Sequence, residues 1–278
     1  MTVASSPLSQ QALAELIERG DGSDRAFVDA LLRMDWARSK DTAQRAALSD
    51  LHAALRVAAL RAHAPVRAQI AQGSLRGAAL RRLFDAVPPF ERDHFVEEVL
   101  GIAYPPLDEL ALTSSELMTY SPAGYDEVVH ALDLTQLGPG DGFLDLGSGL
   151  GKTLLLATLL TGAQSTGLDC DRRLCEQGRA AAAELCLAEV QLQHGDARRA
   201  ASADFDVVFM YLPFAGEVLA TVMQRLLDDA RLPRTRTRQR CLCTAPLELA
   251  RYPELAAVGS AKSWLNVYAW REPGPSVR

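Results

Sequence analysis

Three aspartates in the second half of the chain, Asp145, Asp169 and Asp196, each stand at or just after the end of a short apolar run. The first is followed by a loop in which glycine recurs at every second position. Glycine accepts backbone angles that other residues resist, and it lets a ligand approach the main chain closely. A helical pattern follows the loop, and a helix start offers free amide donors and a positive dipole end. The arrangement is typical of a loop that binds a ligand.

The spacing of the glycines separates the ligand classes that such a loop can serve. A phosphate-binding P-loop needs Gly, four residues and then Gly-Lys-Ser/Thr. Gly151-Lys152-Thr153 supplies that ending, but the position five before Gly151 is Leu146. The strand predicted at 205–210 also ends without the magnesium-binding carboxylate that such an enzyme needs. A dinucleotide loop, Gly-x-Gly-x-x-Gly, differs as well from the strict alternation seen here. An ATPase stays a minor alternative.

The loop Asp145-Leu-Gly147-Ser148-Gly149-Leu-Gly151 resembles the first motif of class I S-adenosylmethionine-dependent methyltransferases. The resemblance implies that Asp145 meets the methionine amino group of the cofactor, directly or through water. It also implies that the glycine backbone lies against the amino-acid part of the cofactor. S-adenosylmethionine has no phosphate and carries a sulfonium and an ammonium, so a carboxylate in the loop suits it.

Two further aspartates stand where this family needs them. Asp169 resembles the carboxylate that accepts hydrogen bonds from the ribose hydroxyls, because one carboxylate can accept from both members of a diol. Asp171 competes for this role but suits the N-cap of the following helix better. Asp196 resembles the residue that receives the adenine amino group. The set predicts S-adenosylmethionine as the cofactor, with a catalytically inactive binding partner as the alternative to an active transferase.

Candidates for the transfer step flank this loop in the sequence. Tyr120 and the Ser-Pro after it resemble the segment that covers the cofactor, and a packing tyrosine at the start of a helix is the alternative. Tyr211 opens Tyr-Leu-Pro-Phe, where enzymes that methylate exocyclic amines carry Asn/Asp/Ser-Pro-Pro-aromatic. This departure argues against a base amine as acceptor, but Tyr211 is still expected to line the transfer pocket. Tyr120 and Tyr211 are the catalytic candidates, and His130 is a third, for which simple burial is the alternative.

A weaker resemblance covers residues 118–225 and points to Dot1-type protein lysine methyltransferases. It rests on Tyr-Ser-Pro-Ala-Gly-Tyr at 120–125, on the Asp-Leu-Gly-Ser-Gly loop and on the strand at 205–210. Those enzymes carry asparagines where this chain has Tyr211 and Leu212. The resemblance implies a protein side chain as acceptor, and a small molecule stays open beside it.

The elements that must position these residues alternate between strand and helix. This pattern predicts an α/β fold, a doubly wound, Rossmann-like sheet of seven strands over residues 111–278, with its ligand at the carboxyl ends of the strands. The expected strands begin at 143 and then cover 165–168, 190–193, 205–210, 241–244, 255–258 and 264–270, and the helices cover 126–134, 153–160, 172–185 and 216–229.

Residues 1–110 are predicted to form an all-helical domain, since apolar residues recur there at three- and four-residue intervals. Asp24 and Asp41 are the expected N-caps, and Pro65 and Pro88-Pro89 are expected breaks. The region carries no chemical motif, so a substrate-selecting cap and a packing or homodimerisation element are both open. The expected helices are 8–19, 24–38, 42–63, 74–86 and 91–100.

Composition limits the remaining function classes. A net charge of -6 and a pI near 5.4 do not favour bulk binding of nucleic acid. An arginine-rich run at 231–240 is either an anion-binding loop or a solvated connector. The five cysteines contain no Cys-x-x-Cys pair, so neither a disulfide framework nor a metal site is expected. No apolar run is long enough for a membrane span and no signal-type leader is visible, so we expect a cytoplasmic protein.

Overall fold

The structure is a computed structural model of the 278-residue chain. It describes residues 9–39, 41–102, 117–118, 120–211, 213–232, 241–245, 249, 252–259 and 265–271. The chain forms two compact units, one made of residues 1–75 and 79–111 and the other of 76–78 and 112–278. None of the helices in the described ranges combines the length and the hydrophobicity that a membrane span requires.

The first unit is helical, as the spacing of its apolar residues predicts. Helices α1, α2 and α3 pack against one another, and α6 packs against α2, α3 and α4. A cluster of buried aliphatic side chains from α1, α2 and α3 forms one core of this unit. The helices are α1 (Gln10–Arg19), α2 (Gly22–Arg38), α3 (Thr42–Ala62), α4 (Ala64–Ala71), α5 (Gly77–Asp85) and α6 (Pro89–Leu100), and the cluster contains Leu13, Ile17, Val28, Leu32, Leu48 and Leu55.

Two details of the helix starts differ from the sequence prediction. The N-cap of α2 is Asp21, not Asp24; Asp24 lies in the first turn and completes a capping box with Asp21. The predicted break near Pro65 is present, since α3 ends at Ala62, but Pro65 lies in the first turn of a further helix, α4, where its missing N–H would have had no helical partner. Asp41 caps α3 as predicted, because its side chain accepts from the amides of Ala43 and Gln44.

A buried carboxylate joins the helices of this unit. The side chain of Glu98 on α6 accepts hydrogen bonds from Nε and Nη2 of Arg25 at 2.7 and 3.0 Å. Nε2 of His63 lies 2.8 Å and Nε2 of His94 3.2 Å from the same carboxylate. Burial alone would raise the pKa of Glu98, but the hydrogen bonds from His63, His94 and Arg25 outweigh it and hold the pKa well below its usual range.

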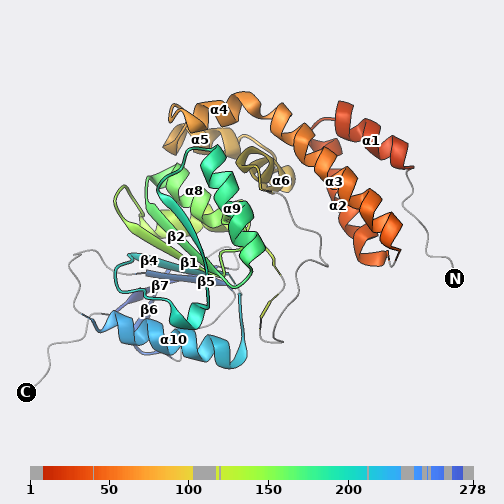
Figure 1. The fold of residues 1–278 in the computed structure, drawn as a ribbon. Coiled ribbons are helices and arrows are strands. Elements are labelled where there is room, and N and C mark those ends of the chain that lie inside the picture. The colour runs from red at the N-terminus through yellow and green to blue at the C-terminus, as the bar shows by residue number, and fades with distance from the viewer. Residues whose placement is uncertain are drawn as a thin grey trace, which may run out of the picture. The chain divides into compact units, whose positions relative to one another are not determined.

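The second unit is built on a seven-stranded sheet in the order β3-β2-β1-β4-β5-β7-β6 (Figure 1). All neighbouring strands pair in parallel except β7, which is antiparallel to both β5 and β6. The last two predicted strands, 255–258 and 264–270, therefore form an antiparallel pair at one edge of the sheet. The strands are β1 (Gly142–Leu146), β2 (Gln164–Asp169), β3 (Val190–His194), β4 (Val207–Tyr211), β5 (Cys241–Ala245), β6 (Leu255–Gly259) and β7 (Asn266–Trp270).

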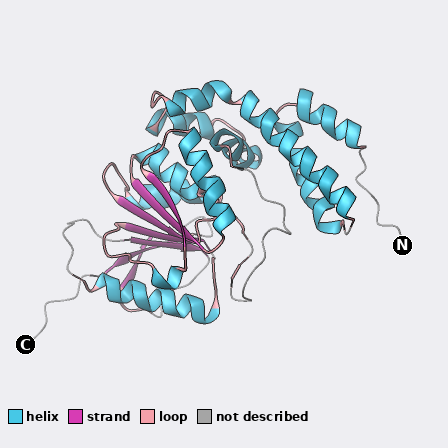
Figure 2. Cartoon of the chain, viewed as in Figure 1, coloured by secondary structure: helices cyan, strands magenta, loops and turns pink. Residues whose placement is uncertain are grey.

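The direction of the chain through the sheet reverses between β1 and β4. From β1 the chain proceeds to β2 and β3, whereas from β4 it proceeds to β5 on the other side. Because parallel crossovers are right-handed, helices of the two halves must cover opposite faces. Figure 2 shows this arrangement, with α8 (Lys152–Thr161) and α9 (Arg172–Glu184) on one side and α10 (Gly216–Ala230) on the other. The predicted doubly wound sheet is confirmed.

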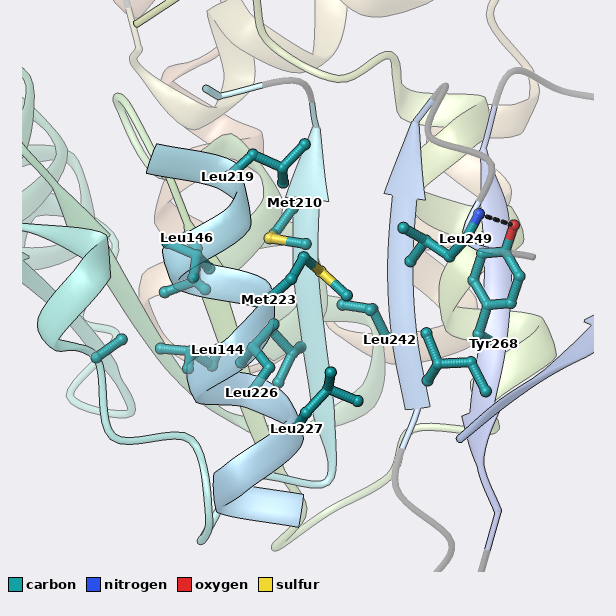
Figure 3. Packing of buried hydrophobic residues seen from close by; sticks show 14 of the residues in the cluster. Leu144, Leu146, Met210, Leu219, Met223, Leu226, Leu227, Leu242, Leu249 and Tyr268 are labelled. Atoms are coloured by element: carbon teal, nitrogen blue, oxygen red, sulfur yellow. Dashed lines mark hydrogen bonds between the residues drawn. The ribbon is translucent and has the colours of Figure 1, made fainter. Parts of the chain in front are cut away.

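Alternate residues of the central strands supply the two apolar faces. Leu144 and Leu146 of β1 and Met210 of β4 pack with Met223 and Leu226 of α10 in one buried cluster (Figure 3). At the edge of this cluster the Tyr268 hydroxyl accepts a 3.2 Å hydrogen bond from the amide of Leu249. The opposite face holds Phe143 and Phe209, whose rings lie 6.0 Å apart, and α8 packs there against β1 and β2.

Candidate functional site

The strand order reverses between β1 and β4, so their carboxyl ends lie side by side at the point of reversal. The loops that leave these neighbouring strands run in opposite directions, and open α/β sheets bind their ligands at such a point. Asp145 is the penultimate residue of β1, and Tyr211 is the last residue of β4. Helix α7 (Tyr125–Thr135) begins five residues after Tyr120 and packs against α8.

The glycine loop between β1 and α8 has a backbone that other residues adopt only with strain. Gly147, Gly149 and Gly151 have φ angles of 85°, 53° and 78°, all in the left-handed region. The loop is fixed to β2 by three hydrogen bonds, of which the one from the amide of Ser148 to the carbonyl of Leu168 is the longest, at 3.3 Å. The amide of Gly147 donates to the carbonyl of Leu168, and the amide of Gly149 donates to Oδ2 of Asp169, both at 2.8 Å. The loop therefore has a fixed shape, set by the neighbouring strand.

Two of these glycines are also needed for close packing. A Cβ at position 147 would clash with Cβ of Pro213, and a Cβ at position 149 would clash with Cε2 of Tyr120. The ring of Tyr120, which the sequence identified as a cover candidate, therefore lies against the glycine loop. Pro213, which was not a predicted site residue, lies against the same loop at Gly147.

Asp145 is buried, with 3% of its surface exposed. Burial, together with the charge of Asp169, raises the pKa of Asp145 to about 8, although a hydrogen bond from Thr153 opposes the shift. A buried carboxyl group with such a raised pKa loses its proton at neutral pH when a cation or a strong hydrogen-bond donor lies beside it, because either one stabilises the carboxylate. The position therefore favours a positively charged ligand.

Asp169 supplies a second carboxylate at the end of β2. Its two oxygens accept 2.8 Å hydrogen bonds, one from the amide of Gly149 and one from the amide of Asp171. Burial raises the pKa of Asp169, and the two backbone hydrogen bonds oppose the rise. Each carboxylate oxygen can accept more than one hydrogen bond, so the two oxygens of Asp169 can also accept hydrogen bonds from the two hydroxyls of a diol. Asp171 is the N-cap of α9, as predicted, and its side chain accepts from the amide of Arg173.

Asp196 follows β3 but is already engaged with a partner that the sequence analysis did not identify. Both of its carboxylate oxygens lie within 3.0 Å of Nε of Arg198, and Oδ2 lies 2.6 Å from Nη2. The Arg198 hydrogen bond is the main reason why the pKa of Asp196 is lowered. A ligand amino group at Asp196 would have to share the carboxylate with this guanidinium. The only sequence signal was the closeness of an acidic and a basic residue in a short loop.

A short pairing of main chains connects the segment before α7 with the loop after β4. Leu117 forms an antiparallel bridge with Phe214, and the amide of Met118 donates a 3.2 Å hydrogen bond to the carbonyl of Pro213. The pairing brings Tyr120 and the loop that starts after Tyr211 to the same part of the site. The sequence analysis did not predict this pairing, because no local pattern indicates which two distant residues will form a β-bridge.

The remaining candidates are less well defined. The Ser148 hydroxyl and Nε2 of His130 are buried, and neither has a hydrogen-bond partner among the described residues.

Of the arginine-rich run, residues 233–240 lie outside the described part of the chain, whereas Arg231 forms surface ion pairs with Asp228 and Glu254. All five cysteines are free thiols. In the described ranges no group of three or more His, Cys, Asp or Glu side chains could hold a metal ion.

Residues 143–230, which include the glycine loop and both acidic strand ends, match the family model described as a methyltransferase domain. The match identifies a methyltransferase domain within the second unit. The match begins at the second residue of β1 and ends with α10. It therefore includes the strands β1 to β4 and the three aspartates Asp145, Asp169 and Asp196. No curated protein matches the chain.

Solved structures of methyltransferases resemble part of the chain. An RNA methyltransferase from Salinibacter ruber in complex with S-adenosyl-L-homocysteine is 22% identical, with 56% of this chain and 98% of that one covered and a TM-score of 0.46. A methyltransferase from Thiobacillus denitrificans is 20% identical over 51% of this chain and 55% of its own, with a TM-score of 0.38. A precorrin-6y C5,15-methyltransferase from Geobacter metallireducens is 18% identical, covers 61% and 100%, and has a TM-score of 0.40. This chain thus spans about half the length of the second protein, and at these values the similarity indicates no particular acceptor.

Proposed function

We propose that the protein binds S-adenosylmethionine and transfers its methyl group to a nitrogen or oxygen atom of an acceptor. A protein side chain or a small molecule is favoured over nucleic acid, because the chain carries a net charge of -6. The observation that supports the proposal most is the pair of carboxylates, Asp145 and Asp169, on the two strands that flank the glycine loop.

The residues of this site fit the proposed cofactor by charge and by donor set. Asp145 is buried beside the charge of Asp169. A ligand that carries an ammonium and a sulfonium would offset the repulsion between these two carboxylates. Asp169 can accept from a ribose diol while it keeps its bonds to the loop. A pyrophosphate would add negative charge beside both carboxylates, so the site does not suit a dinucleotide or ATP. When bound, S-adenosylmethionine supplies a methyl group on a sulfonium, which is a good leaving group.

The protein's own contribution to such a reaction is alignment and the exclusion of water. The ring of Tyr120 lies against Gly149 and is proposed to cover the cofactor, and Tyr211 ends β4, just before the loop that is proposed to hold the acceptor. When the acceptor atom starts protonated, a base is needed, and Tyr120 and Tyr211 are the proposed candidates. The helical first unit is proposed to select the acceptor or to mediate homodimerisation.

The experiment that tests the function measures formation of S-adenosylhomocysteine from S-adenosylmethionine with a panel of acceptors. The panel contains basic peptides, small amines and alcohols, and RNA as the unfavoured class. We expect turnover with a peptide or small-molecule acceptor and its loss in Asp145→Ala. Tight binding of the cofactor without turnover on any acceptor would instead support the inactive binding partner.

A further inference from the structure

Three segments that are distant in sequence make a closed set of contacts around the candidate cofactor site. They are the glycine loop at 147–151, residues 117–118 with Tyr120 before α7, and residues 213–214 after β4. Each of the three touches the other two. All three belong to the second unit, so the set is complete within it.

The first contact covers the glycine loop. The ring of Tyr120 lies so close to Cα of Gly149 that even one methyl group at that position would clash with it. The amide of Gly149 is in turn bonded to Asp169, so the loop cannot move away from the ring without losing that bond. A ligand that lies against the loop at Gly149 must therefore contact Tyr120 or displace it.

The second contact joins the cover to the loop after β4. The amide of Met118 donates to the carbonyl of Pro213 at 3.2 Å, and Leu117 pairs with Phe214. Phe214 is anchored, because its side chain is buried in the cluster beneath α10 and Leu117 packs against the same cluster. The Met118 side chain is exposed, at 48%, so this residue acts here through its main chain.

The third contact closes the set. Pro213 packs against Gly147 closely enough that a Cβ there would clash with the proline ring. Gly147 is bonded to β2 through the carbonyl of Leu168. The loop after β4 is therefore connected to the glycine loop by two routes, directly through Pro213 and indirectly through Met118 and Tyr120.

We propose that Met118 and Pro213 are positioning residues that couple the cofactor site to residues 213–214 after β4, so that a cofactor bound under Tyr120 orders these two residues. This inference rests on the proposed function and extends it to the order of binding, with the cofactor before the acceptor. Packed elements change together rather than independently, so displacement of Tyr120 is passed to residues 213–214 through the main-chain pairing.

The test compares Met118→Pro with Met118→Ala by hydrogen exchange. Met118→Pro removes the amide donor, whereas Met118→Ala keeps it and alters only an exposed side chain. S-adenosylhomocysteine should slow exchange in a peptide covering 211–219 by at least roughly threefold in wild type and Met118→Ala but not in Met118→Pro. Slowing at 145–155 should persist in all three. Equal protection of 211–219 in Met118→Pro and wild type would overturn the proposal.

A second arm needs no ligand and separates this inference from the proposed function. In the free protein, Tyr120→Ala should speed exchange at 211–219 in the Met118→Ala background and have no further effect in the Met118→Pro background. An unchanged rate at 211–219 after Tyr120→Ala would refute the coupling even if the cofactor binds. Conversely, if wild type binds neither S-adenosylmethionine nor its product, the proposed function fails while this arm still decides whether the coupling exists.

Discussion

The amide of Gly149 donates a 2.8 Å hydrogen bond to Oδ2 of Asp169. This bond ties the loop after β1 to the end of β2, and it places one member of the carboxylate pair directly on the glycine backbone. The position of the Asp169 carboxylate therefore depends on the glycine loop, and that of the loop depends on Asp169. A substitution in either should change ligand binding by shifting the other.

Gly149→Ala should weaken binding of S-adenosylhomocysteine by roughly tenfold or more, equivalent to about 1.4 kcal/mol. The substitution adds strain at a φ of 53° and a clash with Tyr120. Gly140→Ala is the matched control, because Gly140 has a φ of 80° but nothing within 4 Å of an added Cβ. Calorimetric titration measures the affinities. If Gly140→Ala weakened binding as much as Gly149→Ala, the contact with Tyr120 would have no role.

Asp145→Asn should stabilise the ligand-free protein at neutral pH. The pKa of Asp145 is raised from 3.8 to about 8, so the folded state binds more protons than the unfolded state between these values. Stability of the wild type therefore falls as the pH rises from about 4 to about 8, and asparagine removes this loss. We expect a gain on the order of 1–3 kcal/mol at pH 8, with little difference near pH 4. Chemical denaturation at several pH values measures it, and a pH-independent difference would contradict the assignment.

The same carboxyl group makes ligand binding pH-dependent. A cationic cofactor favours ionised Asp145, so binding at pH 7 should release a proton and affinity should increase toward pH 8. Calorimetry in buffers of different ionisation enthalpy counts the released protons. Asp145→Asn should release none at this site, and equal proton release in the two proteins would show that another group titrates.

Glu98→Gln should destabilise the first unit by about 3 kcal/mol, because it leaves the buried Arg25 guanidinium without its charged partner. Asp93→Asn, an exposed change on the same helix, is the control. The lowered pKa of Glu98 means that its contribution is complete above its ordinary pKa of 4.5 and declines as the pH falls below it. Thermal unfolding at pH 7 and pH 3 checks both statements. A Glu98→Gln protein as stable as the control would show that the ion pair is dispensable.

Arg198→Ala should leave the stability within about 1 kcal/mol of wild type, since the pair with Asp196 is largely exposed. If Asp196 receives the adenine amino group, removal of the competing guanidinium should tighten cofactor binding by roughly twofold to threefold. Asp196→Ala should weaken it instead. Weaker binding in Arg198→Ala would mean that the arginine itself supports the ligand.

Much of the fold could be predicted from the sequence, because strand and helix periodicity is local. The glycine loop, the strand ends at Asp145 and Asp169, and the N-cap roles of Asp41 and Asp171 all follow from patterns of a few residues. Helix α4 was missed because Pro65 was taken only as the end of one helix, although a proline is also compatible with the first turn of the next.

The parts of the site that could not be predicted depend on contacts across long sequence separations. Pro213 lies against Gly147 only because β1 and β4 are neighbours in the sheet. The pairing of Met118 with Pro213 likewise requires the whole unit to be folded. Neither contact leaves a local signal in composition or spacing.

The central claim is that the carboxylate pair and the glycine loop bind S-adenosylmethionine. The direct measurement is calorimetric titration of S-adenosylmethionine and S-adenosylhomocysteine into wild type, Asp169→Ala and Asp171→Ala, with ATP and magnesium as a control ligand. We predict micromolar binding of both cofactor forms, weakened at least about tenfold by Asp169→Ala but little changed by Asp171→Ala. Folded wild-type protein that binds neither cofactor form, or that binds ATP with magnesium instead, would contradict the account.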